Sequence, residues 1–263
     1  MKFTEFDTPL SEPLIFDSHS HYDDKTFDGV RQSLLSSLTD RGVNRIITCG
    51  CDLESSKKAL SLAEKYDFIY AAAGIHPENL ESGTTVKQIE DLCRGNKKIV
   101  AVGEIGLDYY YNSKNRDEQK KVFEEQLILS NKLGLPVIVH DRDAHSDTLE
   151  LLKKHRPKGV VHCFSGSPEM AAEILKLGMY IGVGGVITFK NAKRLPEVVK
   201  MLPDDRILVE TDCPYLAPEP FRGSVCRSDM IYYTAARIAE IRNTSTTEIL
   251  KQTNKNATVL FGI

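Results

Sequence analysis

A pair of histidines stands directly after a short apolar run near the beginning of the chain. The run Leu14-Ile15-Phe16 is followed by Asp17-Ser18-His19-Ser20-His21. Period-two alternation along a strand would put His19 and His21 on the same face, where both imidazoles could bind one metal ion. A His-x-His pair also arises by chance and can be satisfied by hydrogen bonds in a core, so the rest of the chain must decide between these alternatives.

Other apolar runs also end in a side chain that can bind a metal ion or carry a proton. These side chains are His76, Glu104, His140, His162 and Asp212. Together with the first pair, they include five of the seven histidines of the chain. Any one of them could be a hydrogen-bonded core residue, but random placement would scatter histidines over helices and surface. We therefore interpret the set as one site.

Four imidazoles and two carboxylates suit two divalent cations that share a site. We assign one ion to His19, His21 and Asp212, the second to His140 and His162, and the bridging position to Glu104. Two such ions would activate a water molecule, and Asp212 is our candidate to accept its proton. The alternative is that Asp212 is a ligand only. Nitrogen-rich ligation suits Zn, Mn, Fe, Co or Ni.

Alternating strands and helices would bring these side chains together. The expected strands are 14–21, 45–50, 69–75, 99–104, 136–140, 159–164, 180–186 and 206–211. Apolar spacing predicts helices over 28–41, 54–66, 85–93, 116–133, 143–155, 168–177, 192–201, 228–242 and 246–260. Continuous apolar strands separated by helices predict a parallel sheet covered on both faces. Eight strands in this length favour an α/β fold of the (β/α)8 TIM barrel type, with the metal site at its C-terminal face.

Length and composition fit a soluble protein with ample core. Barrels of about 250 residues are routinely one domain, so we expect residues 1–263 to form a single domain. The formal net charge of −3 argues against a general basic surface for nucleic acid, although a local basic groove is possible. The segment Met1 to Pro13 has no apolar core of signal-peptide length, and no run is long enough to cross a membrane. We expect a cytoplasmic monomer with no membrane partner.

Further side chains are candidates for supporting roles. We expect His76, Arg142 and Arg222 to bind substrate, and we expect His76 to be catalytic together with Glu104 and Asp212. For the two arginines, the alternative is an ion pair with a loop acid such as Asp141 or Glu219. Asp17 and Glu210 would point inward below the metals and orient histidines, or simply pair in the core. The three tyrosines 109–111 could stack on bases or pack a loop.

Some residues receive a purely structural interpretation. The six cysteines show no disulfide spacing and are expected to be reduced. Alternation would turn Cys163 and Cys213 toward the helix layer, as core residues. His145 and His155 fall on a helix outside the site.

Six motifs follow one another along nearly the whole chain. They are Phe16-Asp17-Ser18-His19-Ser20-His21, Gly74-Ile75-His76-Pro77, Val102-Gly103-Glu104-Ile105-Gly106-Leu107-Asp108-Tyr109, Val139-His140-Asp141-Arg142-Asp143-Ala144, Val161-His162-Cys163-Phe164-Ser165-Gly166 and Glu210-Thr211-Asp212-Cys213-Pro214-Tyr215-Leu216. In this combination and order the chain resembles the TatD family of metal-dependent hydrolases, within the amidohydrolase superfamily.

The resemblance implies a barrel with one or two metal ions, and it allows Mg as well as Zn or Mn. It implies ligands at the positions of His19, His21, Glu104, His140, His162 and Asp212. It also implies hydrolysis of phosphodiester bonds in DNA. Two loops depart from the family pattern, since Glu78 stands where His-Pro-His is common, and 222–228 lacks the usual Arg-Gly-x-x-Asn-x-Pro. These departures bear on substrate choice and leave the metal ligands intact.

Three functional hypotheses follow. The leading one is a metal-dependent deoxyribonuclease that acts on ends or single strands, as an exonuclease, because a concave barrel-top pocket does not admit an unopened duplex. The second is a hydrolase of a small phosphoester or an amide, since the same ions activate water against either. The third is a non-catalytic scaffold, which the complete ligand set opposes.

Overall fold

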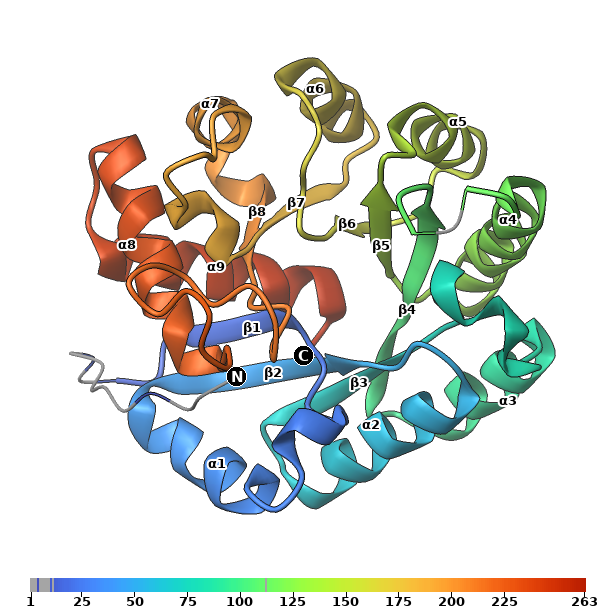
Figure 1. The fold of residues 1–263 in the computed structure, drawn as a ribbon, viewed down its shortest axis with the longest axis horizontal. Helices are drawn as coiled ribbons and strands as arrows, with labels where there is room; N and C mark the ends of the chain where they lie inside the picture. Colours follow the sequence, from blue (N-terminus) through green and yellow to red (C-terminus); the bar gives the residue numbers. More distant parts are fainter. Residues whose placement is uncertain (1–3, 5–9, 11, 112) are drawn as a thin grey trace.

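Eight parallel strands, each paired with the next in chain order, form the centre of the computed structural model, which describes residues 4, 10, 12–111 and 113–263 (Figure 1). The strands are β1 (Ile15–Ser20), β2 (Val43–Cys49), β3 (Ile69–Ala73), β4 (Ile99–Asp108), β5 (Val137–Arg142), β6 (Gly159–Val161), β7 (Tyr180–Val183) and β8 (Ile207–Val209). The backbone after β8 returns to β1, where Asp212 N donates to His19 O at 3.0 Å and His21 N donates to Cys213 O at 2.8 Å. These bonds bring the last strand beside the first and nearly close the barrel.

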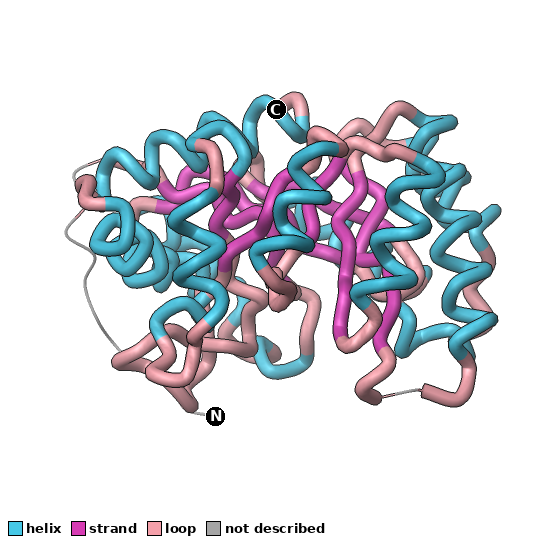
Figure 2. The backbone as a smooth tube through the Cα atoms, turned by 90° about the horizontal axis from the view of Figure 1, so that it is seen from above, coloured by secondary structure: helices cyan, strands magenta, loops and turns pink. Residues whose placement is uncertain are grey.

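Helices surround the strands as an outer layer (Figures 1 and 2). They are α1 (Arg31–Leu38), α2 (Leu53–Lys65), α3 (Val86–Gly95), α4 (Arg116–Leu133), α5 (His145–His155), α6 (Pro168–Lys176), α7 (Arg194–Met201), α8 (Ile231–Arg242) and α9 (Thr246–Phe261). Local sequence explains several boundaries. Asp52 and Ser245 cap α2 and α9 through capping boxes, and Gly134 ends α4 in the left-handed conformation.

Two apolar clusters hold the layers together. One lies inside the barrel and includes Phe16, Ile47, Ile138 and Leu208, and the other fills the space between strands and helices. Phe261 of α9 packs against Phe16, with ring centroids 6.2 Å apart, so α9 covers the inner cluster. Both faces of each strand are covered, and the strands are therefore continuous apolar runs in the sequence.

The predicted (β/α)8 barrel is confirmed, but several strand ends differ. β4 continues four residues past Glu104, whereas β6 and β8 end earlier than expected, at Val161 and Val209. Gly106 permits the long β4, because a Cβ there would lie 1.9 Å from the carbonyl oxygen of His140 on β5. The single-domain assignment stays a prediction. The expected absence of a signal peptide concerns residues that lie mostly outside those described.

In the part of the chain that the structure describes, no helix combines the length and the apolar character needed to cross a membrane.

Candidate metal centre

The side chains predicted as ligands meet in one cavity at the C-terminal ends of the strands. The cavity has a volume of about 940 Å³. Its lining includes His21, His76, Glu104, His140, His162 and Asp212, and His19 lies fully buried directly beneath. Residues separated by almost 200 positions in sequence are thus brought within ion-pair distance, as the barrel topology requires.

Glu104 lies between two groups of ring nitrogens. Its Oε2 is 3.4 Å from His19 Nε2 and 3.3 Å from His21 Nε2. Its Oε1 is 2.7 Å from His162 Nε2 and 2.9 Å from His140 Nδ1. Each carboxylate oxygen therefore faces its own histidine pair, which is the arrangement that a bridging ligand requires.

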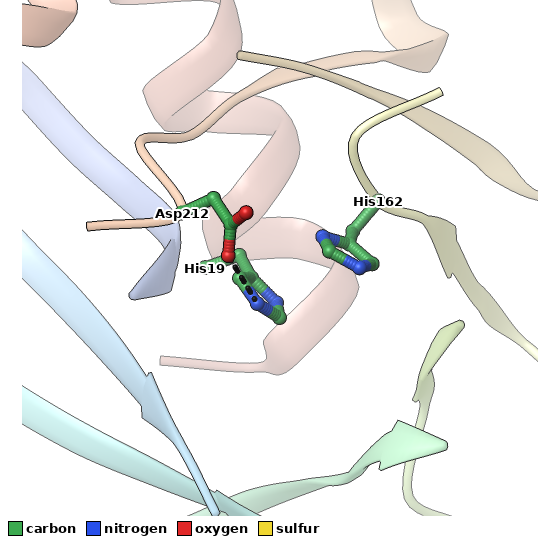
Figure 3. A group of neighbouring side chains, drawn as sticks. All are labelled: His19, His162 and Asp212. Atoms are coloured by element: carbon green, nitrogen blue, oxygen red, sulfur yellow. Dashed lines mark ion pairs between the residues drawn. The ribbon is translucent and has the colours of Figure 1, made fainter. Parts of the chain in front are cut away.

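The donor atoms converge in a way that suits cations. His19 Nε2 and His21 Nε2 are 3.0 Å apart, and each is 3.5 Å from Asp212 Oδ1. Figure 3 shows Asp212 on one side of His19 and His162 on the other, and the His19 and His162 rings stack with centroids 3.9 Å apart. Buried ring nitrogens that face one another need either a hydrogen bond between them or a positive charge that both can contact. The residues present therefore fit divalent metal ions.

Three overlapping groups within the described chain could each hold an ion. They are His19 with His162 and Asp212, His19 with His21 and Glu104, and His76 with Glu104 and His140. The second and third groups share Glu104. The number and identity of the ions remain predictions.

The outward-facing nitrogens of His21 and His140 each have a hydrogen-bonding neighbour that can fix the orientation of the ring. His21 Nδ1 is 2.9 Å from the carbonyl oxygen of Cys49, and His140 Nε2 is 3.1 Å from Asp108 Oδ2. His162 Nδ1 lies 3.5 Å from Glu210 Oε1 without a hydrogen bond between them, so the orienting role of Glu210 stays a prediction. At His21 and His140 these neighbours hold a proton on the outer nitrogen, so the inner nitrogen faces the site and can bind a metal ion in place of any proton there.

His76 has the opposite proton arrangement. Its Nδ1 accepts a hydrogen bond from the backbone N–H of Glu78 at 3.1 Å, so in the neutral ring the proton is on Nε2. Nε2 points into the site, 3.4 Å from Glu104 Oε1. Burial lowers the pKa of His76 and keeps the ring neutral. This imidazole is therefore a hydrogen-bond donor to the cavity.

The carboxylates at the centre are ionised. Burial opposes the charge on Glu104, but the surrounding histidines, His162 foremost, hold the pKa of its carboxyl well below the usual range. At Asp212, burial is likewise outweighed by His19 and His21, and the pKa is lowered. Burial alone would lower the pKa of His140, yet Asp108 and Glu104 raise it to about 9.

The interpretation of Asp17 as a residue that orients a histidine ring was wrong. Its carboxylate accepts hydrogen bonds from the hydroxyls of Ser228 and Thr211, at 2.6 and 2.7 Å, and from the backbone N–H of Thr211 and His19. Strand pairing shifts register between Asp17 and Ser20, so simple alternation does not continue to the histidines. Burial raises the pKa of Asp17 to about 6 despite these bonds.

Cys163 was also misplaced by alternation. Because β6 ends at Val161, the chain has already left the strand at Cys163, whose φ is 42°. Its side chain is half-buried and lines the cavity, whereas Cys213 is fully buried as expected. The backbone N–H of Cys163 donates to Glu210. All six cysteines are free, as predicted.

The two arginines proposed for substrate binding lie in different surroundings. Arg142 lines the cavity, and its guanidinium lies over the rings of Tyr110 and Tyr111. Arg222 is exposed, stacks on Phe189 at 4.4 Å, and is not among the residues that line the cavity. The structure thus brings Arg142 to the site and does not bring Arg222 there.

Sequence reasoning missed three residues that support the site. The first is Asp108, which contacts His140. If the predicted strand had been extended past Glu104, alternation would have placed the carboxylates of Glu104 and Asp108 on the same face of the strand. Gln119 and Gln126 of α4 each clamp a backbone segment: Gln126 bonds Ile75 N and O, at 2.7 and 3.0 Å, and Gln119 bonds Asp108 N and O, at 2.8 and 3.0 Å. The spacing of seven residues on one helix face was the available signal.

The lining of the cavity is acidic. Eight of its described residues are Asp or Glu, and Arg142 is the only Lys or Arg among them: the acids are Asp23, Asp24, Asp52, Glu78, Glu104, Asp141, Asp143 and Asp212. An anionic substrate would be repelled by this lining unless cations are bound.

Comparisons with known proteins agree with the geometry. The family model described as TatD related DNase matches residues 16–262. The chain is 40% identical over 255 residues to the uncharacterized metal-dependent hydrolase YabD of Bacillus subtilis, covering 95% of this chain and 100% of that protein. The crystal structure of YJJV, a TatD homolog from Escherichia coli K12, has a TM-score of 0.90 at 35% identity and covers 95% of this chain and 99% of that one. A TatD family hydrolase structure from Entamoeba histolytica has a TM-score of 0.85 at 26% identity, with 95% and 98% covered.

Proposed function

Since this chain belongs to the family of TatD-related DNases and is a metal-dependent hydrolase, we propose that it hydrolyses phosphodiester bonds in DNA, at strand ends or in single strands, as an exonuclease. One observation carries the proposal. The two oxygens of Glu104 face two separate histidine pairs, a geometry suited to two ions that act together on one phosphoryl group.

We assign the ligands as in the sequence prediction. His19, His21 and Asp212 would hold one ion, His140 and His162 the other, and Glu104 would contact both. Divalent ions bound there would supply Lewis-acid activation of water and neutralise charge on the phosphoryl oxygens. The proton arrangement of His76 makes it a hydrogen-bond donor rather than a third ligand to the second ion.

Three side chains of the protein would act directly on the attacking water and on the phosphate. Asp212, which is ionised and partly exposed to the cavity, would accept the proton of the attacking water. His76 directs its Nε2–H into the same space and would donate to a phosphoryl oxygen. Arg142 at the cavity wall would pair with a phosphate.

The acidic lining makes bound metal a requirement for substrate binding as well as for chemistry. With eight carboxylates and one arginine around the cavity, the metal ions and Arg142 supply the positive charge that meets the DNA backbone. A strand would therefore contact the protein through few phosphates, which favours short or single-stranded substrates over a duplex gripped along its length.

The test is hydrolysis of end-labelled single- and double-stranded DNA by metal-free protein with Mg²⁺, Mn²⁺ or Zn²⁺ restored separately. We expect metal-dependent shortening from one end, faster on the single strand. Stoichiometric metal binding without cleavage of DNA by any ion would contradict the proposal. Turnover of small phosphomonoesters or amides in the same preparations would then assign a small-molecule hydrolase.

A further inference from the structure

Two exposed tyrosines and an arginine form a stack at the mouth of the metal cavity. Tyr110 and Tyr111 are 60% and 62% exposed, and their rings meet edge to face with centroids 4.9 Å apart. The Arg142 guanidinium lies 4.2 Å from the centroid of Tyr110 and 4.6 Å from that of Tyr111. Tyr111 and Arg142 also line the cavity that holds Glu104 and His140. Apolar ring faces are therefore presented to solvent beside the proposed reaction centre.

Tyr109, which directly precedes these two tyrosines, has a packing role. Its hydroxyl donates to Asp147 at 2.7 Å, Arg116 lies 4.3 Å over its ring, and it packs against the apolar cluster between strands and helices. In the described chain, the ring contacts of Tyr110 and Tyr111 are with Arg142 and with each other, and both side chains are exposed. Loop packing therefore accounts for the first tyrosine and leaves the other two unexplained.

One carboxylate ties this stack to the metal centre. Asp108 Oδ1 accepts the backbone N–H of Tyr110 and of Tyr111, both at 2.8 Å. Asp108 Oδ2 lies 3.1 Å from Nε2 of His140, whose Nδ1 faces Glu104. Asp108 is fully buried, and Gln119 bonds its backbone on both sides. The tyrosine turn is thus held at a fixed position relative to the candidate metal ligands.

We propose that Tyr111, with Tyr110 and Arg142 beside it, forms a nucleobase-stacking subsite that takes an unpaired base of single-stranded DNA, while the adjoining phosphodiester lies at the metal centre within reach of the Arg142 N–H groups. The inference rests on the proposed function and specifies its substrate. Aromatic rings and guanidinium planes bind any base through its π-face, independently of base identity. A base inside a duplex has both faces covered by its neighbours, so only a single strand or a frayed end offers a free face.

Fluorescence provides a direct test, because the chain contains no tryptophan. Tyr111→Trp introduces a single reporter into the stack. A matched control is Tyr66→Trp, since Tyr66 follows α2 and precedes β3, at the opposite end of the barrel, and also lies beneath a lysine, at 5.4 Å. Both are made in the Asp212→Asn background and loaded with Zn²⁺, so that the DNA stays intact.

The probe is a five-residue oligothymidylate, compared with the same backbone carrying abasic residues. We expect the oligothymidylate to quench the reporter at position 111 and not that at position 66, and the abasic strand to quench neither. Equal quenching at 111 by both strands, or none by either while the strand binds, overturns the subsite.

A rate measurement separates this inference from the proposed function. In the unmodified, metal-loaded protein we expect hydrolysis of the base-bearing strand to exceed that of the abasic strand at least about fivefold, the lower end of what stacking contributes per base. Tyr111→Ala should bring the ratio close to one. Hydrolysis of both strands at equal rates by the unmodified protein overturns the subsite alone, whereas hydrolysis of neither overturns the proposed function and the subsite with it.

Discussion

At the scale of single residues, the site depends on which nitrogen of each histidine carries the proton. His140 directs Nδ1 toward Glu104 because Asp108 takes Nε2, and His76 directs Nε2 inward because a backbone N–H takes Nδ1. In the first arrangement a metal ion can replace the proton on Nδ1, and in the second Nε2–H is a donor for a substrate oxygen. We propose that neighbours outside the metal site thereby assign His140 to metal ligation and His76 to substrate binding.

Asp108→Asn tests this division of roles. An amide can present N–H to His140 Nε2 and so move the proton of the neutral ring to Nδ1, where it blocks ligation. We expect metal affinity to fall about 10- to 100-fold, measured by competition with a chromophoric chelator. Activity should be largely regained at high metal concentration. An unchanged metal affinity would show that Asp108 does not position His140.

Asp212→Asn separates proton transfer from ligation. The amide keeps one oxygen for an ion but cannot accept the proton of the attacking water. We expect the hydrolysis rate at saturating metal to fall about 10²- to 10⁴-fold, while metal content measured by mass spectrometry falls much less. If loss of metal accounts for the whole loss of rate, Asp212 acts as a ligand only.

The cluster itself was predictable from sequence because barrel strands all deliver their C-terminal ends to one face. Every predicted metal ligand lies at that face. Side-chain direction was less predictable, since it depends on where alternation stops. A register shift turned Asp17 away from the histidine rings, and the early end of β6 brought Cys163 to the cavity. Asp108 was missed because β4 continues past Glu104.

At the scale of elements, α4 connects the outer layer to the site. Gln119 and Gln126 lie on one face of this helix and hold the backbone at Asp108 and at Ile75, directly before His76. The bounds of α4 were predicted to the residue, because apolar spacing and Gly134 mark them. The strand ends were not, because they depend on contacts with neighbouring strands that a single sequence does not display.

Gln126→Ala should destabilise the protein and disturb His76 together. The change leaves a buried N–H and a buried C=O of Ile75 without their partner, so we expect the free energy of unfolding to fall by about 2–4 kcal/mol, measured by urea denaturation. The matched control is Gln32→Ala on the exposed face of α1, where we expect a change within about 0.5 kcal/mol. Equal stability of the two variants would contradict the clamp.

At the scale of the whole molecule, the fold concentrates charge that metal ions must balance. The chain carries a net charge of −3, and eight of its carboxylates, including ionised Glu104 and Asp212, line the cavity. Bound divalent ions would neutralise part of this charge in the native state only. The metal ions are therefore expected to stabilise the barrel as well as to activate the site.

Chelation should lower the melting temperature. A ligand at 100 times its dissociation constant stabilises the native state by about 2.7 kcal/mol, which corresponds to roughly 5–10 °C for a chain of this size. Calorimetry with and without chelator measures the shift. Glu104→Ala is the control, because a protein that has lost the bridging carboxylate should show little response. An equal shift in the variant would place the stabilising ions elsewhere.

We propose that Glu104 joins two metal positions at which phosphodiester bonds of DNA are hydrolysed. The most direct test is to count metal ions per chain and to follow hydrolysis of end-labelled single-stranded DNA in the same preparations of unmodified protein, Glu104→Ala and Glu78→Ala. Glu78 is a matched carboxylate of the same cavity wall. We predict two ions and metal-dependent hydrolysis in the unmodified protein, both strongly reduced in Glu104→Ala, and two ions retained in Glu78→Ala. Undiminished hydrolysis by Glu104→Ala with its metal content intact would contradict the claim.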